Sequence, residues 1–255
     1  MNSYTAPADL LKDRIILVTG AGDGIGRVAA RRFAAFGATV ILLGRTIRKL
    51  EQVYDEIAQA GHPQAAIYPM NLEGASPKDY IDLAHVLETE FGRLDGLLHN
   101  AATLGALTPI VHYDIELWYK VLQVNLNAPF LLTQAVLGPL TRSLDASIVF
   151  TADTVSEEGR AYWGAYAVAK SGAQTLMKML ASELETNTSV RVNSIDPGNV
   201  RSGLRLKAYP AGNPEEWVDP ETIMGTYLYL MGPDSRGITG QTFRVTAGAD
   251  LPGKP

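Results

Sequence analysis

The chain has 255 residues, of which 46% are hydrophobic and 19% are charged, and this balance predicts one globular domain over residues 1–255. Its net charge of −5 gives no reason to expect nucleic acid or an anionic membrane as a partner. The lack of cysteine excludes disulfides and thiol chemistry. With neither a spanning apolar run nor a signal-peptide pattern, we expect a cytoplasmic protein.

Strand and helix signals alternate along the chain. Short apolar runs predict buried strands at residues 15–18, 39–43, 65–70, 94–99, 147–150, 190–195 and 242–246. Capping residues and helical spacing predict helices at residues 25–37, 46–61 and 76–91, after residue 114, through residues 166–184 and after residue 219. Repeated strand–helix units imply a Rossmann-like α/β fold, a doubly wound parallel sheet of about seven strands between two helical layers.

Ligands of such sheets bind beyond the carboxyl ends of the strands. The segments that follow predicted strands there are residues 20–26, 44–45, 100–102, 151–153 and 197–202. Residues 203–216 contain two prolines and two glycines, so we expect an irregular lid within a substrate loop of about residues 200–218. The alternative is an ordinary surface loop.

A glycine-rich turn joins the first strand to the first helix. It reads Thr19-Gly20-Ala21-Gly22-Asp23-Gly24-Ile25-Gly26. Glycines let the backbone approach a pyrophosphate, and a helix N-terminus attracts its charge. A preceding strand and a following helix favour a nucleotide site over an ordinary connection.

The end of the second strand bears on which nicotinamide cofactor is bound. A site for NAD usually has an acidic residue there, but this chain reads Leu43-Gly44-Arg45. Arg45 could pair with a 2′-phosphate, so NADP(H) is favoured over NAD(H). Asp23 argues the other way, because it places an acid in the glycine turn, and Arg45 could also be merely solvated.

Tyr166 and Lys170 stand four residues apart in Tyr-Ala-Val-Ala-Lys. On a helix this spacing places both side chains on one face. A nearby ammonium stabilises a phenolate and brings the pKa of the phenol closer to neutral pH. The pair is therefore suited to proton transfer accompanying hydride chemistry.

Together these features resemble the short-chain dehydrogenase/reductase family over nearly the whole chain. The matching residues are Thr19, Gly20, Gly24, Ile25 and Gly26, then Asn100-Ala101-Ala102, Asn125, Tyr166, Lys170 and Pro197-Gly198. More narrowly, Asp-Arg-Ile-Ile-Leu-Val-Thr-Gly and Trp-Gly-Ala-Tyr resemble an uncharacterised bacterial subgroup. The family pairs the helix after residue 114 and the tyrosine helix between subunits, so the resemblance implies a homodimer or homotetramer.

The resemblance also implies roles for individual residues. Tyr166 would be the general acid or base, Lys170 would lower its pKa and hold the nicotinamide ribose, and Asn125 would hold a water that completes a proton relay. Cofactor contacts would come from Gly20, Gly22, Asp23, Gly24, Ile25, Gly26, Arg45, Asn71, Leu72, Asn100, Ala101, Ala102, Tyr166, Lys170, Pro197, Gly198, Val200 and Ser202. No metal site is expected, because the four histidines lack ligand spacing.

One position departs from the family pattern. The family's catalytic serine usually lies thirteen residues before the tyrosine, and here that position is Asp153. An ionised carboxylate accepts but does not donate a hydrogen bond. Thr151 or Thr154 could supply the hydroxyl while Asp153 turns away. Alternatively, Asp153 could be protonated and donate.

In a third reading Asp153 serves a nitrogen substrate, because the spacing Asp153–Tyr166–Lys170 resembles that of pteridine reductases, which use NADPH. The sequence thus favours an NADP(H)-dependent oxidoreductase acting on a small carbonyl or alcohol. A reductase of C=N bonds such as a dihydropterin is the first alternative. A non-catalytic NADP(H)-binding protein is the second, and a Rossmann methyltransferase the third.

Overall fold

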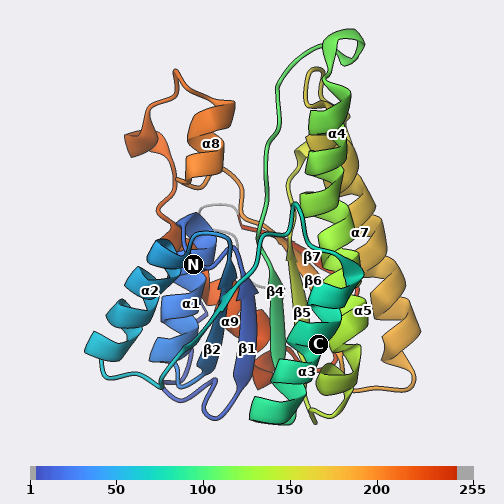
Figure 1. The fold of residues 1–255 in the computed structure, drawn as a ribbon. Coiled ribbons are helices and arrows are strands. Elements are labelled where there is room, and N and C mark those ends of the chain that lie inside the picture. The colour runs from blue at the N-terminus through green and yellow to red at the C-terminus, as the bar shows by residue number, and fades with distance from the viewer. Residues whose placement is uncertain (1–3, 246–255) are drawn as a thin grey trace.

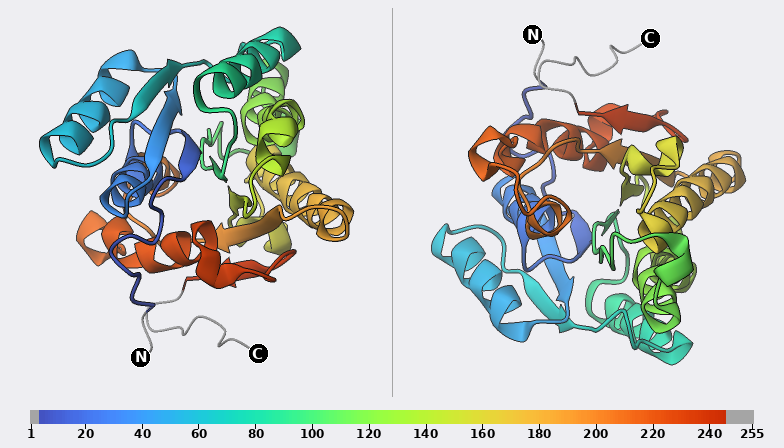
Figure 2. Two further views of the ribbon diagram at one scale, coloured as in Figure 1. Left: turned by 90° about the horizontal axis from the view of Figure 1, so that it is seen from below. Right: turned by 90° about the horizontal axis from the view of Figure 1, so that it is seen from above.

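The computed structural model describes residues 4–245. Seven parallel strands form one sheet in the order β3-β2-β1-β4-β5-β6-β7, with helices on both faces (Figures 1 and 2). The strands are β1 (Ile15–Thr19), β2 (Thr39–Gly44), β3 (Ala66–Pro69), β4 (Gly96–His99), β5 (Ser147–Thr151), β6 (Arg191–Asp196) and β7 (Thr242–Arg244). The predicted doubly wound fold is confirmed. The end of the last predicted strand, residue 246, lies outside the described residues.

The helices occupy the connections between these strands. They are α1 (Gly24–Ala35), α2 (Ile47–Gln59), α3 (Pro77–Phe91), α4 (Ile115–Leu122), α5 (Ala128–Thr141), α6 (Val155–Glu158), α7 (Gly164–Glu185), α8 (Gly203–Ala208) and α9 (Met224–Met231). Short 3-10 turns are η1 (Ile110–His112), η3 (Pro214–Glu216), η4 (Pro220–Ile223) and η5 (Pro233–Ser235). Within the described range, no helix is long and apolar enough to cross a membrane.

Alternating strand residues build two separate cores. Ile16 and Val18 of β1 face the layer formed by α1, α2 and α9. Leu17, between them, faces the layer formed by α3, α5 and α7. Because each face carries a helical layer, both sets of strand side chains must be apolar, and this explains the uninterrupted apolar runs in the sequence.

The predicted helix after residue 114 is interrupted in its middle. Asp114 caps α4 by accepting a hydrogen bond from the Leu117 amide at 2.7 Å. A π-helical segment, η2 (Gln123–Asn127), then joins α4 to α5. Such segments insert an extra residue into a helix and are frequent at functional sites. Here the segment carries Asn125.

The prediction of an irregular lid at residues 203–216 is wrong in its secondary structure. The segment forms α8 and η3. Val200 and Val218 form an isolated parallel bridge at its base, with the Arg201 amide donating to the Val218 carbonyl at 2.9 Å. The helix α8 therefore stands on a closed loop above the carboxyl edge of the sheet (Figure 1).

Candidate functional site

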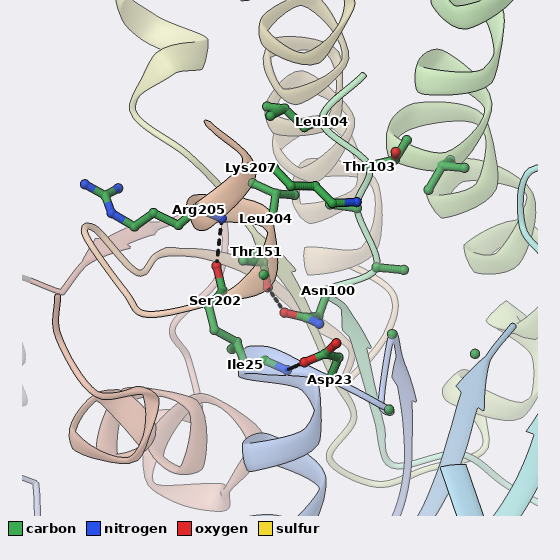
Figure 3. Close-up of a pocket in the computed structure, with 18 of the residues that line it drawn as sticks. Asp23, Ile25, Asn100, Thr103, Leu104, Thr151, Ser202, Leu204, Arg205 and Lys207 are labelled. Carbon is green, nitrogen blue, oxygen red and sulfur yellow. Dashed lines mark hydrogen bonds between the residues drawn. The ribbon is translucent and has the colours of Figure 1, made fainter. Parts of the chain in front are cut away.

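A cavity of about 520 Å³ lies at the carboxyl ends of the strands, between the glycine turn, α7 and α8 (Figure 3). The strand order runs outward from β1 to β2 and β3 on one side and from β4 to β7 on the other. The connections therefore diverge between β1 and β4, and a crevice opens there. This is the place where a doubly wound sheet binds its ligand.

The glycine turn has the geometry that a close approach to a ligand requires. Gly20 has φ +68°, which favours glycine. A Cβ on Gly26 would lie 2.3 Å from the carbonyl oxygen of Gly20 and 2.5 Å from Nδ2 of Asn100. Gly26 therefore packs the turn against β4 and is absent from the cavity lining. Five other predicted residues of the turn line the cavity: Gly20, Gly22, Asp23, Gly24 and Ile25.

The acid in the glycine turn is neutralised within the protein. Lys49 donates to the Asp23 carboxylate at 2.5 Å, and the Gly24 amide donates to it at 2.8 Å. The hydrogen bond from Lys49 is the largest influence lowering the pKa of Asp23. Asp23 is thus the N-cap of α1 and one half of an ion pair. The local charge near the turn is balanced.

Arg45 lies at the far end of the cavity, beyond the end of β2. Its exposed side chain makes no hydrogen bond or ion pair within residues 4–245. Asn71 and Leu72 line the same end, whereas Arg48 does not line it. An unpaired guanidinium here is free to bind a phosphate.

Tyr166 and Lys170 are buried beside each other on α7. Tyr166 is 3% exposed and Lys170 is 6% exposed, and the ammonium lies 5.8 Å from the centroid of the tyrosine ring. The Lys170 ammonium donates to the Thr151 carbonyl at 2.7 Å. Burial lowers the pKa of Lys170 to about 8. This juxtaposition is the one that the four-residue spacing predicts.

Asp153 faces Tyr166 directly. The Tyr166 hydroxyl donates to Oδ2 of Asp153 at 3.0 Å, and the other carboxylate oxygen accepts from the Val155 amide at 3.1 Å. Burial, and then the negative charge of Asp153, raises the pKa of Tyr166 well above its usual value. The alternative in which Asp153 turns away is therefore wrong for this structure. Of the two threonines weighed as serine substitutes, Thr151 lines the cavity and Thr154 does not.

The glycine turn and the Tyr166–Lys170 pair both lie within a segment that matches a known protein family. The family model described as short chain dehydrogenase matches residues 14–211. The chain belongs to this family. Relatives in this family are named oxidoreductases or dehydrogenases, so the chain is an NAD(P)-dependent oxidoreductase, and the methyltransferase alternative falls away.

Several individual members of the short-chain dehydrogenase family are closely similar to this chain. "Uncharacterized oxidoreductase YciK" of Escherichia coli K12 is 45% identical over 245 residues, 96% of each chain. A short chain dehydrogenase structure from Pseudomonas syringae is 54% identical, with a TM-score of 0.93, covering 96% of this chain and 99% of that one. One from E. coli CFT073, complexed with NADPH, is 46% identical, with a TM-score of 0.90 and coverages of 93% and 98%.

The remaining residues that the short-chain dehydrogenase resemblance singles out differ in where the structure places them. Those that line the cavity are Asn100, Ala101, Ala102, Pro197, Gly198, Val200 and Ser202. Asn125 is buried behind the lining, where its side chain accepts from the Thr103 amide at 2.9 Å and donates to the Thr103 carbonyl at 2.8 Å. Its amide therefore holds the segment after β4 in place.

The sequence did not identify one wall of the cavity. Leu104, Trp163, Leu204 and Tyr209 line it, and the Trp163 ring centroid lies 5.7 Å from that of Tyr166 and 6.0 Å from that of Tyr209. Trp163 both lines the cavity and packs in the core, where it is 7% exposed. Leu204 and Tyr209 fall within the predicted lid, and this was the only sign in the sequence that they could line the cavity. A lid has no sequence pattern that shows which of its side chains face a ligand.

The burial of Lys170 predicts a change in stability that can be measured without substrate. Below pH 8 the ammonium is charged in both folded and unfolded chains, so the folded protein bears the full cost of burying it. One pKa unit corresponds to about 1.4 kcal/mol. Lys170→Met should therefore remove a charge-burial cost of about 3 kcal/mol at pH 7, and loss of the hydrogen bond to the Thr151 carbonyl offsets part of this gain in stability.

The sign of this effect has a pH signature. Between pH 8 and the ordinary lysine pKa the unfolded chain binds more protons, so wild-type stability rises with pH and the advantage of the variant shrinks. Urea unfolding at pH 7 and pH 10 measures both effects, with the exposed Lys178→Met on the same helix as control. A methionine variant that is less stable at pH 7 would contradict the prediction.

Proposed function

We propose that this protein is an NADP(H)-dependent oxidoreductase that acts on a small carbonyl or alcohol, with Tyr166 as general acid or base. The observation that carries the proposal is the buried Tyr166 hydroxyl in the same cavity as the glycine turn. Lys170 beside it would compensate the charge of a phenolate. A proton donor and the glycine turn thus line one cavity.

The residues present fit NADP(H). Gly24 and Ile25, in the first turn of α1, line the cavity, and a helix N-terminus there suits a pyrophosphate. Arg45 would pair with the 2′-phosphate, and the complexes of similar proteins with NADPH support this preference. When bound, the cofactor supplies or accepts hydride. Pro197, Gly198 and Val200 would border its reactive ring, and Ser202 starts α8 within reach of the turn.

Proton delivery follows from the environment of Tyr166. Because its pKa is raised, the phenol stays protonated at neutral pH, as a general acid for reduction must. It has one hydroxyl proton, which it donates to Asp153 in this structure. A substrate oxygen would compete for that proton, and Thr151 is the neighbouring hydroxyl that lines the cavity.

Tyr166→Phe tests the mechanism. The phenylalanine keeps the ring and its packing against Trp163 but removes the proton, so kcat for NADPH-dependent carbonyl reduction should fall by about 10² or more. NADPH affinity should stay within about twofold, because the hydroxyl is a minor part of cofactor binding. Steady-state kinetics and fluorescence titration measure the two quantities. The control is Tyr162→Phe, because Tyr162 is exposed and lies outside the cavity. Unimpaired turnover by Tyr166→Phe would contradict the mechanism.

Arg45→Asp tests the cofactor preference. An aspartate repels a 2′-phosphate and accepts hydrogen bonds from ribose hydroxyls, so the ratio of kcat/KM for NADPH to that for NADH should fall by about tenfold or more. Arg48→Asp makes the same charge change at an exposed position that does not line the cavity, and should leave the ratio unchanged. Equal NADPH-to-NADH ratios of kcat/KM for wild type and Arg45→Asp would show that Arg45 does not determine the cofactor preference.

A second candidate reaction is reduction of a C=N bond, and the hydrogen bond between Asp153 and Tyr166 favours it. A carboxylate at this position can accept from the N–H of an imine or attract an iminium charge. It cannot, while ionised, donate to a carbonyl oxygen. The alternative of a protonated Asp153 that acts as donor keeps carbonyl chemistry open.

Asp153→Ser separates the two reactions. If Asp153 serves a nitrogen substrate, the serine should lower kcat/KM for C=N compounds, including dihydropterins, by about 10². It should preserve or raise activity toward matched carbonyls, since a hydroxyl donates to their oxygen. NADPH oxidation across both panels by wild type, Asp153→Ser and Asp153→Asn is the measurement. Wild-type turnover confined to carbonyls would reject the C=N candidate.

The proposed assembly is a homodimer or homotetramer. Phe130 of α5 and Val168 and Met179 of α7 are exposed large apolar side chains, and α5 and α7 border a groove. Burying these side chains in a second copy is favourable. A monomeric mass by light scattering at micromolar concentration would contradict the assembly.

A further inference from the structure

Lys207 is a cation on the lid helix α8 that the proposed function does not use. It lines the cavity, and its side chain extends from α8 over the cavity toward the segment that carries Thr103 (Figure 3). Within residues 4–245 its ammonium makes no hydrogen bond or ion pair. An exposed lysine without a carboxylate partner at the mouth of a cavity is available to an anionic ligand.

The other charged groups that line the cavity have partners or other positions. Arg205, on the same helix, stacks over Tyr209 at 4.8 Å and over Trp217 at 5.4 Å, and its guanidinium points away from the cavity (Figure 3). Lys170 donates to a backbone carbonyl. The lining carboxylates are occupied too, with Asp23 paired to Lys49, Asp153 bonded to Tyr166 and Glu73 near Lys120 at 3.9 Å.

Two lining cations, Arg45 and Lys207, therefore have no ion pair, hydrogen bond or stacked aromatic ring among the described residues, and they stand on different elements. Arg45 follows β2, at the end where the cofactor's 2′-phosphate is expected. Lys207 is on α8, on the side of the apolar wall formed by Leu104, Trp163 and Tyr209. This wall runs beside Tyr166, so a substrate whose reactive group meets Tyr166 can pack its body against the wall and reach Lys207.

We propose that Lys207 binds an anionic group, a carboxylate or phosphate, at the end of the substrate remote from its reacting carbon. The substrate would then be an organic anion with an apolar body between the reacting group and the charge. This inference rests on the proposed function for the chemistry at Tyr166. It does not depend on whether the reacting bond is C=O or C=N, because the anion is recognised elsewhere.

Calorimetric titration of the NADP⁺-saturated protein tests the inference without turnover. The probes are 3-phenylpropionate, the neutral 3-phenylpropanamide of similar shape, and 2-phenylethyl phosphate. A charge-assisted hydrogen bond predicts that the acid binds wild type about tenfold or more tightly than the amide. Lys207→Met should remove this difference, Lys207→Arg should keep most of it, and the exposed Lys178→Met should match wild type.

The outcomes separate the possibilities. Lys207-dependent binding of the phosphate ester that exceeds that of the acid would identify phosphate as the anion. Equal binding of acid and amide to wild type would overturn the inference. The inference would also be overturned if Lys207→Met bound the acid as tightly as wild type but bound NADP⁺ at least about tenfold more weakly, because Lys207 would then bind the cofactor and not the substrate. Loss of turnover in every carbonyl and imine assay, with Lys207-dependent acid binding intact, would reject the proposed function alone.

Discussion

Asn100 and Thr19 join the ends of three strands, and the rest of the site is built around this junction. The Thr19 hydroxyl accepts from the amides of Asn100 and Ala101 at 3.0 and 3.1 Å and donates to the Leu98 carbonyl. The Asn100 side chain donates to the Thr19 carbonyl and accepts from Thr151 at 3.4 Å (Figure 3). Gly26 leaves room for it. The glycine turn, the end of β4 and the segment carrying Asp153 are thereby held in register.

Two ionisable side chains are buried beside each other near this junction. Lys170 and Tyr166 are removed from water, which disfavours the ammonium and the phenolate alike. Each charged form is stable in this site only if neighbouring groups hydrogen-bond it or carry the opposite charge. The Lys170 ammonium already donates a hydrogen bond to the Thr151 carbonyl. Burying these groups lowers the stability of the protein without cofactor, but it prepares the site for a charged transition state. Active sites commonly lose stability in this way.

Sequence periodicity predicted those parts of the site that local rules determine. Buried parallel strands read as apolar runs, and a four-residue helical spacing placed Tyr166 beside Lys170. The π segment at Asn125 escaped prediction because one inserted residue barely changes an apolar pattern. The helix α8 escaped prediction because its run of helix-forming residues, 204–208, is short and stands among the glycines and prolines of the same segment. Asp153 was identified by position, but only the structure shows that it faces Tyr166.

Charge placement across the cavity restricts what the substrate can be. Asp153 lies at the reacting end and Lys207 on the lid, with an apolar wall between them. A neutral apolar ketone would compete with Asp153 for the Tyr166 proton and would leave the Lys207 ammonium without an anionic partner. A molecule that carries a hydrogen-bond donor at one end and an anion at the other satisfies both. Selectivity would then come as much from the weaker binding of ligands that lack one of these two groups as from the tight binding of a ligand that has both.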